Sequence, residues 1–90
     1  MDIRIIAAEM KTSPEDGYIG NVRFAVEGHP KDYEMTLYSK KGKDWEYGLH
    51  FAEESGSDDL IEAVEAYLEE NDEAFDAIVD AAYASMTNKP

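Results

Sequence analysis

The apolar pattern of this chain changes within one stretch, WEYGLHFAEESGSDDLIEAV, which covers residues 45–64. Before Glu53 the apolar residues come at every second position, as they do in a strand that buries one face. Beyond Ser57 they come three or four residues apart, as they do along one side of a helix. Ser57 is a suitable N-cap, since Asp58 and Asp59 follow it in the first turn. The stretch therefore predicts a sheet that gives way to helix.

Other segments upstream of this stretch also have the pattern of strands with one apolar face. Two more alternating sets are Val22, Phe24 and Val26, and then Tyr33, Met35 and Leu37. Residues 3–10 form another expected strand, and its facing stays open because Ile5 and Ile6 are adjacent. Together with residues 45–51, these segments predict a four-stranded antiparallel sheet with one apolar face.

Turn residues predict the register of each hairpin. Residues 40–42, Lys-Lys-Gly, read as a three-residue loop that pairs Leu37 with Trp45. Residues 28–31, Gly-His-Pro-Lys, pair Val26 with Tyr33 by the same argument. Residues 13–17, Ser-Pro-Glu-Asp-Gly, supply the turn between the first two strands. These registers place the apolar sets on one side of a meander whose strands pair in chain order.

The helical segment continues one apolar stripe from Leu60 to Met86 in nearly constant phase. A single helix over residues 58–86 would measure about 43 Å, whereas a nine-residue strand spans only about 30 Å. Asn71 and Asp72 can end one helix and cap another. We expect one kinked helix or two helices, packed on one face of the sheet. The predicted fold is α+β in a single domain, residues 1–90, with the sheet at 2–52 and the helical segment at 57–87.

The net charge of −13 is unevenly distributed along the chain. Residues 1–44 carry seven basic and eight acidic side chains, whereas residues 45–90 carry thirteen acidic side chains and only Lys89 as a base. Nucleic acid and anionic membranes are poor partners for such a C-terminal half, because both are negatively charged. A basic protein is the better match.

The expected cellular compartment of the protein, and the cofactors it could bind, are limited by features that the sequence does not contain. There is no cysteine, which removes a disulfide framework and any zinc site built on thiolates. The N-terminus shows no basic region followed by an apolar run, and no apolar stretch approaches the roughly 20 residues that span a bilayer. We therefore expect a cytoplasmic protein without a membrane partner.

A row of carboxylates is the most unusual feature of the helical segment. Spacings of three and four residues separate Asp58, Glu62, Glu65, Glu69, Asp72, Asp76 and Asp80. One interpretation is a solvated face that keeps a small protein soluble. The other is a protein-binding surface for a basic partner, because repulsion without local compensation is the cost expected of an interaction surface. As an imitation of DNA the row is sparse, with one charge per about 5 Å against one per 3.4 Å on each DNA strand.

No catalytic or metal-binding motif stands out, so we expect neither an enzyme nor a cofactor. Residues 53–59 are rich in oxygen ligands but lack the alternating spacing of a calcium-binding loop. His29 and His50 are not spaced as metal ligands. An alternative function is a small-ligand or catalytic site at the seam between sheet and helix, near Trp45, Tyr47 and His50.

The expected function is therefore a small acidic interaction domain that binds a basic protein through its helical face. A nuclease- or toxin-neutralising inhibitor, or a DNA-mimic-like one, is a narrower alternative. Homo-oligomerisation stays open because the lysines at 40, 41 and 43 form a basic hairpin tip that is complementary to the carboxylates of a second copy. The outward positions of the strands carry Ala25, Thr36, Tyr38, Gly48 and Ala52. Small residues around a tyrosine would suit a second sheet, but they fit a plain exposed face better.

The uncompensated carboxylates predict that the protein becomes more stable as salt is added. Ions screen the repulsion between neighbouring like charges, each pair of which costs about 0.2–0.5 kcal/mol on a helix. The melting temperature should therefore rise between about 20 mM and about 500 mM sodium chloride, a range over which the Debye length falls severalfold. An unchanged or lower melting temperature would contradict an exposed and self-repelling row.

Overall fold

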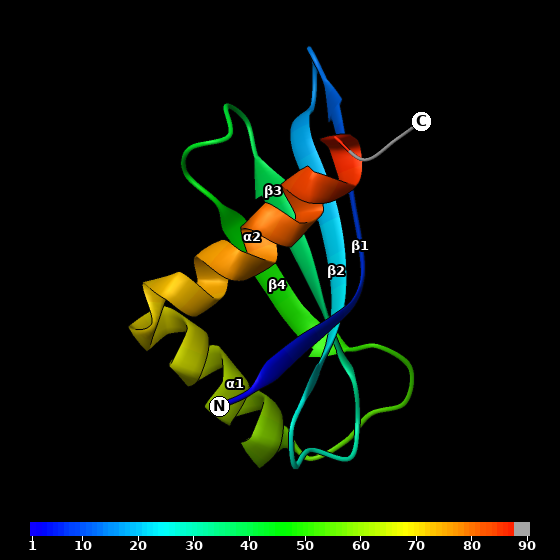
Figure 1. Ribbon diagram of the computed structural model, residues 1–90, viewed down its shortest axis with the longest axis vertical. Coiled ribbons are helices and arrows are strands. Elements are labelled where there is room, and N and C mark those ends of the chain that lie inside the picture. The colour runs from blue at the N-terminus through cyan, green and yellow to red at the C-terminus, as the bar shows by residue number, and fades with distance from the viewer. Residues whose placement is uncertain (88–90) are drawn as a thin grey trace.

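A computed structural model describes residues 1–87 of the chain and shows the predicted α+β fold (Figure 1). The strands are β1 (Ile3–Ser13), β2 (Gly17–Val26), β3 (Tyr33–Ser39) and β4 (Glu46–Phe51), and the helices are α1 (Asp58–Glu70) and α2 (Asp72–Thr87). The strands form one antiparallel sheet in the order β1-β2-β3-β4. The four-stranded meander followed by helix is thus confirmed. Over residues 1–87, no helix is long and apolar enough to cross a bilayer.

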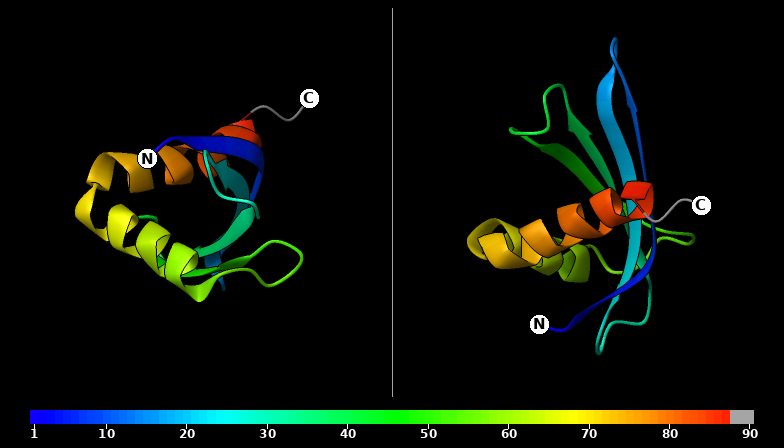
Figure 2. Two further views of the ribbon diagram at one scale, coloured as in Figure 1. Left: turned by 90° about the horizontal axis from the view of Figure 1, so that it is seen from below. Right: turned by 45° about the horizontal axis from the view of Figure 1, so that its top comes forward.

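Both helices lie on the same face of the twisted sheet, which we call the inner face. α2 packs against β1 and β2, whereas α1 lies beside β4 and touches α2 (Figures 1 and 2). The two helices meet at an angle, so that together they form a V over the sheet. The opposite face, which we call the outer face, is not covered by either helix.

The core between sheet and helices contains the apolar sets that the alternation predicted. The buried strand residues include Val22, Phe24, Val26, Tyr33, Met35 and Leu37, and the buried helix residues are Val64, Leu68, Ile78, Val79 and Ala82. Tyr33 is fully buried, and its hydroxyl lies 2.7 Å from Nδ1 of His29 in the preceding loop. That hydrogen bond satisfies the polar end of an otherwise apolar side chain.

A β-bulge in β1 decides the facing that Ile5 and Ile6 had left open. Ile5 pairs with Phe24, and Ala7 pairs with the adjacent Arg23, so Ile6 is an extra residue without a partner of its own. The bulge restores the alternation beyond it, because it shifts the register of β1 by one residue. As a result Met10 faces the core and is 2% exposed.

The predicted registers of the second and third hairpins are wrong by two residues. Leu37 pairs with Tyr47 rather than with Trp45, and Tyr33 pairs with Phe24 rather than with Val26. Both loops are longer than predicted and cover residues 27–32 and 40–45. Since the shift is even, the residues of β2, β3 and β4 keep their predicted faces.

Packing explains the longer loop between β3 and β4. Gly42 has a φ of +79°, and its N–H donates to Oγ of the buried Ser39 at 2.8 Å. Trp45 lies in the loop instead of in the strand, where its ring contacts those of Tyr18 and Tyr83 edge-on, with centroids 6.1 and 5.9 Å away. Tertiary contacts of Trp45 therefore override the three-residue loop that the local sequence favours.

The helix break at Asn71 is confirmed, and Asn71 forms hydrogen bonds with the end of α1 and with the start of α2. The backbone N–H and the side-chain Nδ2 of Asn71 both donate to the carbonyl oxygen of Tyr67, at 3.0 and 2.9 Å. Its own carbonyl accepts from the N–H groups of Ala74 and Phe75. Ser57 caps α1 as expected, since its Oγ accepts from the N–H of Leu60 at 3.4 Å.

The placement of the helices on the inner face predicts opposite outcomes for two neighbouring residues of β3. Leu37 is fully buried beneath the helices, so Leu37→Ala should lower the free energy of unfolding by about 2–5 kcal/mol. Thr36 is exposed on the outer face, so Thr36→Ala should change it by less than about 1 kcal/mol. Urea melts monitored by circular dichroism give both values. Equal losses for the two variants would contradict the facing.

Candidate protein-binding surface

The first half of the predicted carboxylate row lies along one side of α1. Asp58, Glu62, Glu65 and Glu69 are all exposed, and they recur at helical spacing. The apolar side of the same helix points toward the core, where Val64 and Leu68 are buried. The helix therefore presents a charged flank to solvent while Val64 and Leu68 hold it on the sheet.

The second half of the row lies on α2 and points along a different direction. Asp72, Asp76 and Asp80 are exposed at spacings of one turn, and Ile78 and Val79 bury the other side of the helix. The seven carboxylates, which we call the acidic helix surface, thus form two rows on the arms of the V (Figure 1). A single uninterrupted helix would have placed them in one row.

No cation pairs with the acidic helix surface in the part of the chain that the structure describes. The ion pairs are Arg23–Asp32 at 3.3 Å, Arg23–Glu53 at 2.9 Å and Lys31–Glu54 at 3.0 Å, and Nε2 of His50 lies 3.0 Å from Oε1 of Glu34. All of them join residues of the sheet or of its loops. Arg23 and Lys31 therefore pair with carboxylates away from the helices, and within residues 1–87 the carboxylates of the helices have no cationic partner.

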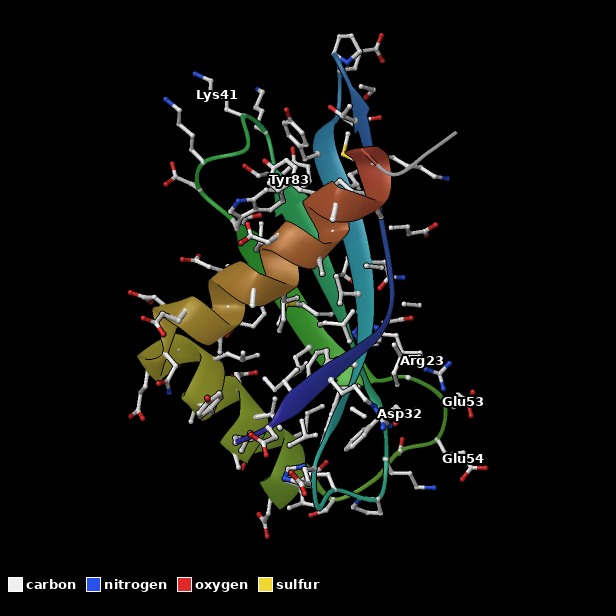
Figure 3. The ribbon with its side chains drawn as sticks, viewed as in Figure 1. Arg23, Asp32, Lys41, Glu53, Glu54 and Tyr83 are labelled. Atoms are coloured by element: carbon white, nitrogen blue, oxygen red, sulfur yellow. The ribbon has the colours of Figure 1, made fainter. Side chains whose placement is uncertain are left out.

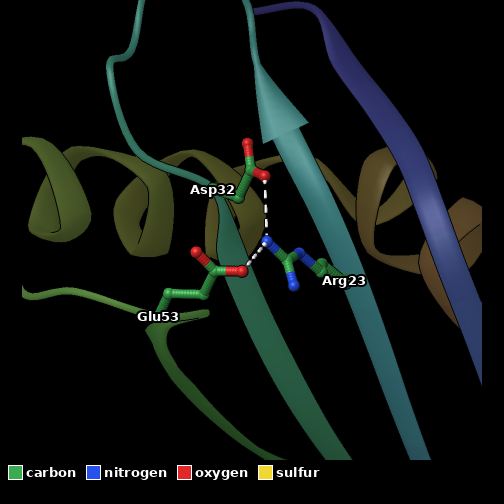
Figure 4. Close-up of polar contacts among 3 residues, drawn as sticks. All are labelled: Arg23, Asp32 and Glu53. Carbon is green, nitrogen blue, oxygen red and sulfur yellow. Dashed lines mark hydrogen bonds and ion pairs between the residues drawn. The ribbon is translucent and has the colours of Figure 1, made fainter.

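The cluster around Arg23 was not predicted from the sequence. One guanidinium nitrogen of Arg23, on β2, reaches both Asp32 in the loop before β3 and Glu53 after β4 (Figure 4). Glu53 is thirty residues away along the chain, so no local spacing could have indicated this contact. The hollow beside it, of about 310 Å³, is lined by two cations and three carboxylates, among other residues. This balance makes it a poor site for an anion.

Tyr47 shows how close α1 lies to the edge strand β4. Its hydroxyl donates to Oε1 of Glu69 at 3.4 Å. Burial raises the pKa of the Tyr47 phenol above its usual value, and the negative charges of Glu69 and Glu65 raise it further. Two members of the acidic helix surface therefore act electrostatically on the sheet beneath them.

The basic hairpin tip lies at the end of the molecule opposite Arg23 (Figure 3). Lys40, Lys41 and Lys43 are exposed, and none of them forms an ion pair within residues 1–87. Beneath the tip, the rings of Tyr18 and Tyr83 lie 5.6 Å apart, edge to face. The tip is thus a solvated loop on an aromatic base.

The residues of the alternative seam site lie on different faces. Tyr47 packs against the core on the inner face, whereas His50 is exposed on the outer face and bonds Glu34. Four open hollows on the described part of the surface, of about 210 to 460 Å³, are lined by residues other than Trp45, Tyr47 and His50. Among residues 1–87, no group of three or more His, Asp or Glu side chains is placed to hold a metal ion.

Comparison with protein-family models, with curated proteins and with solved structures found no match to this chain. The function must therefore be argued from the molecule's own surfaces.

The position of α1 predicts how the pKa of Tyr47 responds to its neighbours. The double substitution Glu65→Gln and Glu69→Gln removes two negative charges and should lower the pKa of the Tyr47 phenol. Burial remains, so the pKa should stay above its ordinary value of 10. Tyrosine ¹³Cζ NMR titration resolves this residue from the other tyrosines. An unchanged pKa would place α1 farther from β4 than the structure does.

Proposed function

We propose that the protein is a non-enzymatic interaction domain that binds a basic protein through the acidic helix surface. The observation that carries the proposal is the lack of any ion pair on that surface within residues 1–87. Across the described chain, none of the carboxylates on α1 and α2 forms an ion pair, although Arg23 and Lys31 pair with three carboxylates elsewhere. Within residues 1–87, the Lys and Arg side chains that form ion pairs therefore do so away from the acidic helix surface.

The unpaired charge has an energetic cost that solubility does not require. Like charges one turn apart on a helix destabilise it by about 0.2–0.5 kcal/mol per pair. Interspersed charges of both signs would keep the molecule soluble at a smaller cost. A cation-rich partner would relieve this repulsion on binding and would be steered toward the surface by its field.

The angle between α1 and α2 limits the shape of the basic surface that a partner can present. The rows on α1 and α2 diverge from Asn71, so a partner that contacts both must present basic groups over a broad area rather than along a line. A protein that recognises a straight strand of phosphates is a poorer match, because the carboxylates follow two directions. This favours the broader interaction domain over the DNA-mimic-like inhibitor.

The test compares two variants that carry the same change in charge. The helix variant replaces Glu62, Glu65, Glu69 and Asp76 with lysine. The control variant replaces four exposed loop carboxylates that form no ion pair within residues 1–87, namely Glu15, Asp16, Glu27 and Asp44, with lysine. Both variants change the net charge equally, so only the position of the charge differs. Far-UV circular dichroism verifies that each remains folded.

Immobilised wild-type protein and the control variant should retain the same basic protein from native lysate, identified by mass spectrometry, and the helix variant should lose it. Added salt should slow the association of the wild type more than that of the helix variant, because charges at an interface mainly steer the encounter. Retention of the same protein by the helix variant would contradict the proposal. If that variant also becomes less soluble, the carboxylates serve only as a solubility device.

A further inference from the structure

We propose that a second copy of this chain docks on the outer face of the sheet and forms a twofold, face-to-face dimer. The outer face is opposite to the acidic helix surface, so this contact is separate from the proposed function. Neither helix covers the outer face (Figure 2).

The centre of the outer face carries a large apolar pair. Ile19 on β2 is 46% exposed and Tyr38 on β3 is 40% exposed, and they are direct cross-strand partners. Both lie on the two central strands, where side chains of this size would otherwise be expected on the buried face. An exposed isoleucine beside an exposed tyrosine is a contact that a second apolar surface would stabilise.

The row that contains this pair is complementary to itself. Lys11 on β1 pairs with Ile19, and Glu46 on β4 pairs with Tyr38, so the row reads basic, apolar, apolar, acidic across the four strands. A twofold axis parallel to the strands and midway between β2 and β3 reverses this order in the second copy. Lys11 then faces the partner's Glu46, and Ile19 faces the partner's Tyr38. Each contact occurs twice by symmetry.

The adjacent row allows the two sheets to approach. It runs from Glu9 through Asn21 and Thr36 to Gly48, so its central side chains are short. Packed sheets lie about 10 Å apart, so short side chains in this row leave room for the larger Ile19 and Tyr38 of the neighbouring row.

The contact is limited to the half of the outer face that contains these two rows. In the other half, Glu53 reaches back across the outer side of the sheet to Arg23 (Figure 4). The patch is therefore smaller than a standard interface, which buries about 1,600 Å² in total, and we expect weak and reversible dimerisation. The helices of both copies point outward in this arrangement, which keeps their carboxylates apart.

The proposal is tested by sedimentation equilibrium from about 20 µM to about 1 mM protein, in about 150 mM sodium chloride to screen the net charge. Lys11→Glu and Glu46→Lys each place like charges opposite each other twice in the dimer. Each should weaken dimerisation by roughly 5–30-fold. The double variant Lys11→Glu, Glu46→Lys exchanges the two charges and should restore it. Ile19→Thr, which keeps a β-branched residue in the strand, should also weaken it.

Net charge alone predicts a different result for one of these variants. Glu46→Lys makes each copy less negative, so general repulsion between copies would fall and dimerisation would strengthen. The matched control is Glu62→Lys, which makes the same change on the acidic helix surface and should not weaken the dimer. A monomer at every concentration would overturn the proposal. So would strengthening by Glu46→Lys, or a double variant that is as weak as the single ones. Circular dichroism of each variant separates loss of the dimer from loss of the fold.

Discussion

Burial of the inner face of the sheet beneath α1 and α2 is the interaction on which the rest of the structure depends. A chain of 90 residues can enclose only one thin core, so all of its apolar sets must meet in a single layer. The fully buried Val64 and Ala82, both of modest size, let the helices lie close to the strands. Once both helices occupy this face, the outer face and the outward sides of the helices are left to solvent. Those two surfaces carry most of the charged side chains discussed above.

Charged side chains are arranged differently on the two surfaces. On the outer side of the sheet and its loops, cations and carboxylates are held together, as they are at Arg23 and Lys31. On the helices, carboxylates stand without any such partner in residues 1–87. A locally balanced surface can approach a copy of itself, whereas a surface of one sign repels its copy and attracts the opposite sign. The proposed dimer and the proposed partner therefore use different faces without competing.

A dimer would also present two acidic helix surfaces outward, and two linked sites can bind a repetitive basic partner more tightly than either site alone.

The carboxylates themselves were found from the sequence, but their arrangement was not. Helical spacing after Ser57 was enough to predict that Asp58 to Asp80 would be exposed on the side opposite the apolar stripe. The capping capacity of Asn71 indicated a break, and its hydrogen bonds with Tyr67, Ala74 and Phe75 show how the break is made. The angle between the two helices, which divides the seven carboxylates into two rows, depends on how α2 packs on β1 and β2. No spacing within the helical segment contains that information.

The sequence by itself determined the face that the residues of β2, β3 and β4 take, the meander order and the ends of the helices. These features depend on alternation, on helical periodicity and on caps, all of which act over a few neighbouring residues. Only the tertiary structure decided the registers, the bulge at Ile6, the place of Trp45 in a loop and the contact of Arg23 with Glu53. Each of these joins segments that are distant along the chain, and its free energy depends on how well whole elements pack together. An even shift of register leaves the alternation unchanged, so the pattern alone cannot distinguish one pairing from the next. The packing of the core and the aromatic contacts of Trp45 can distinguish them, because they differ from one register to another.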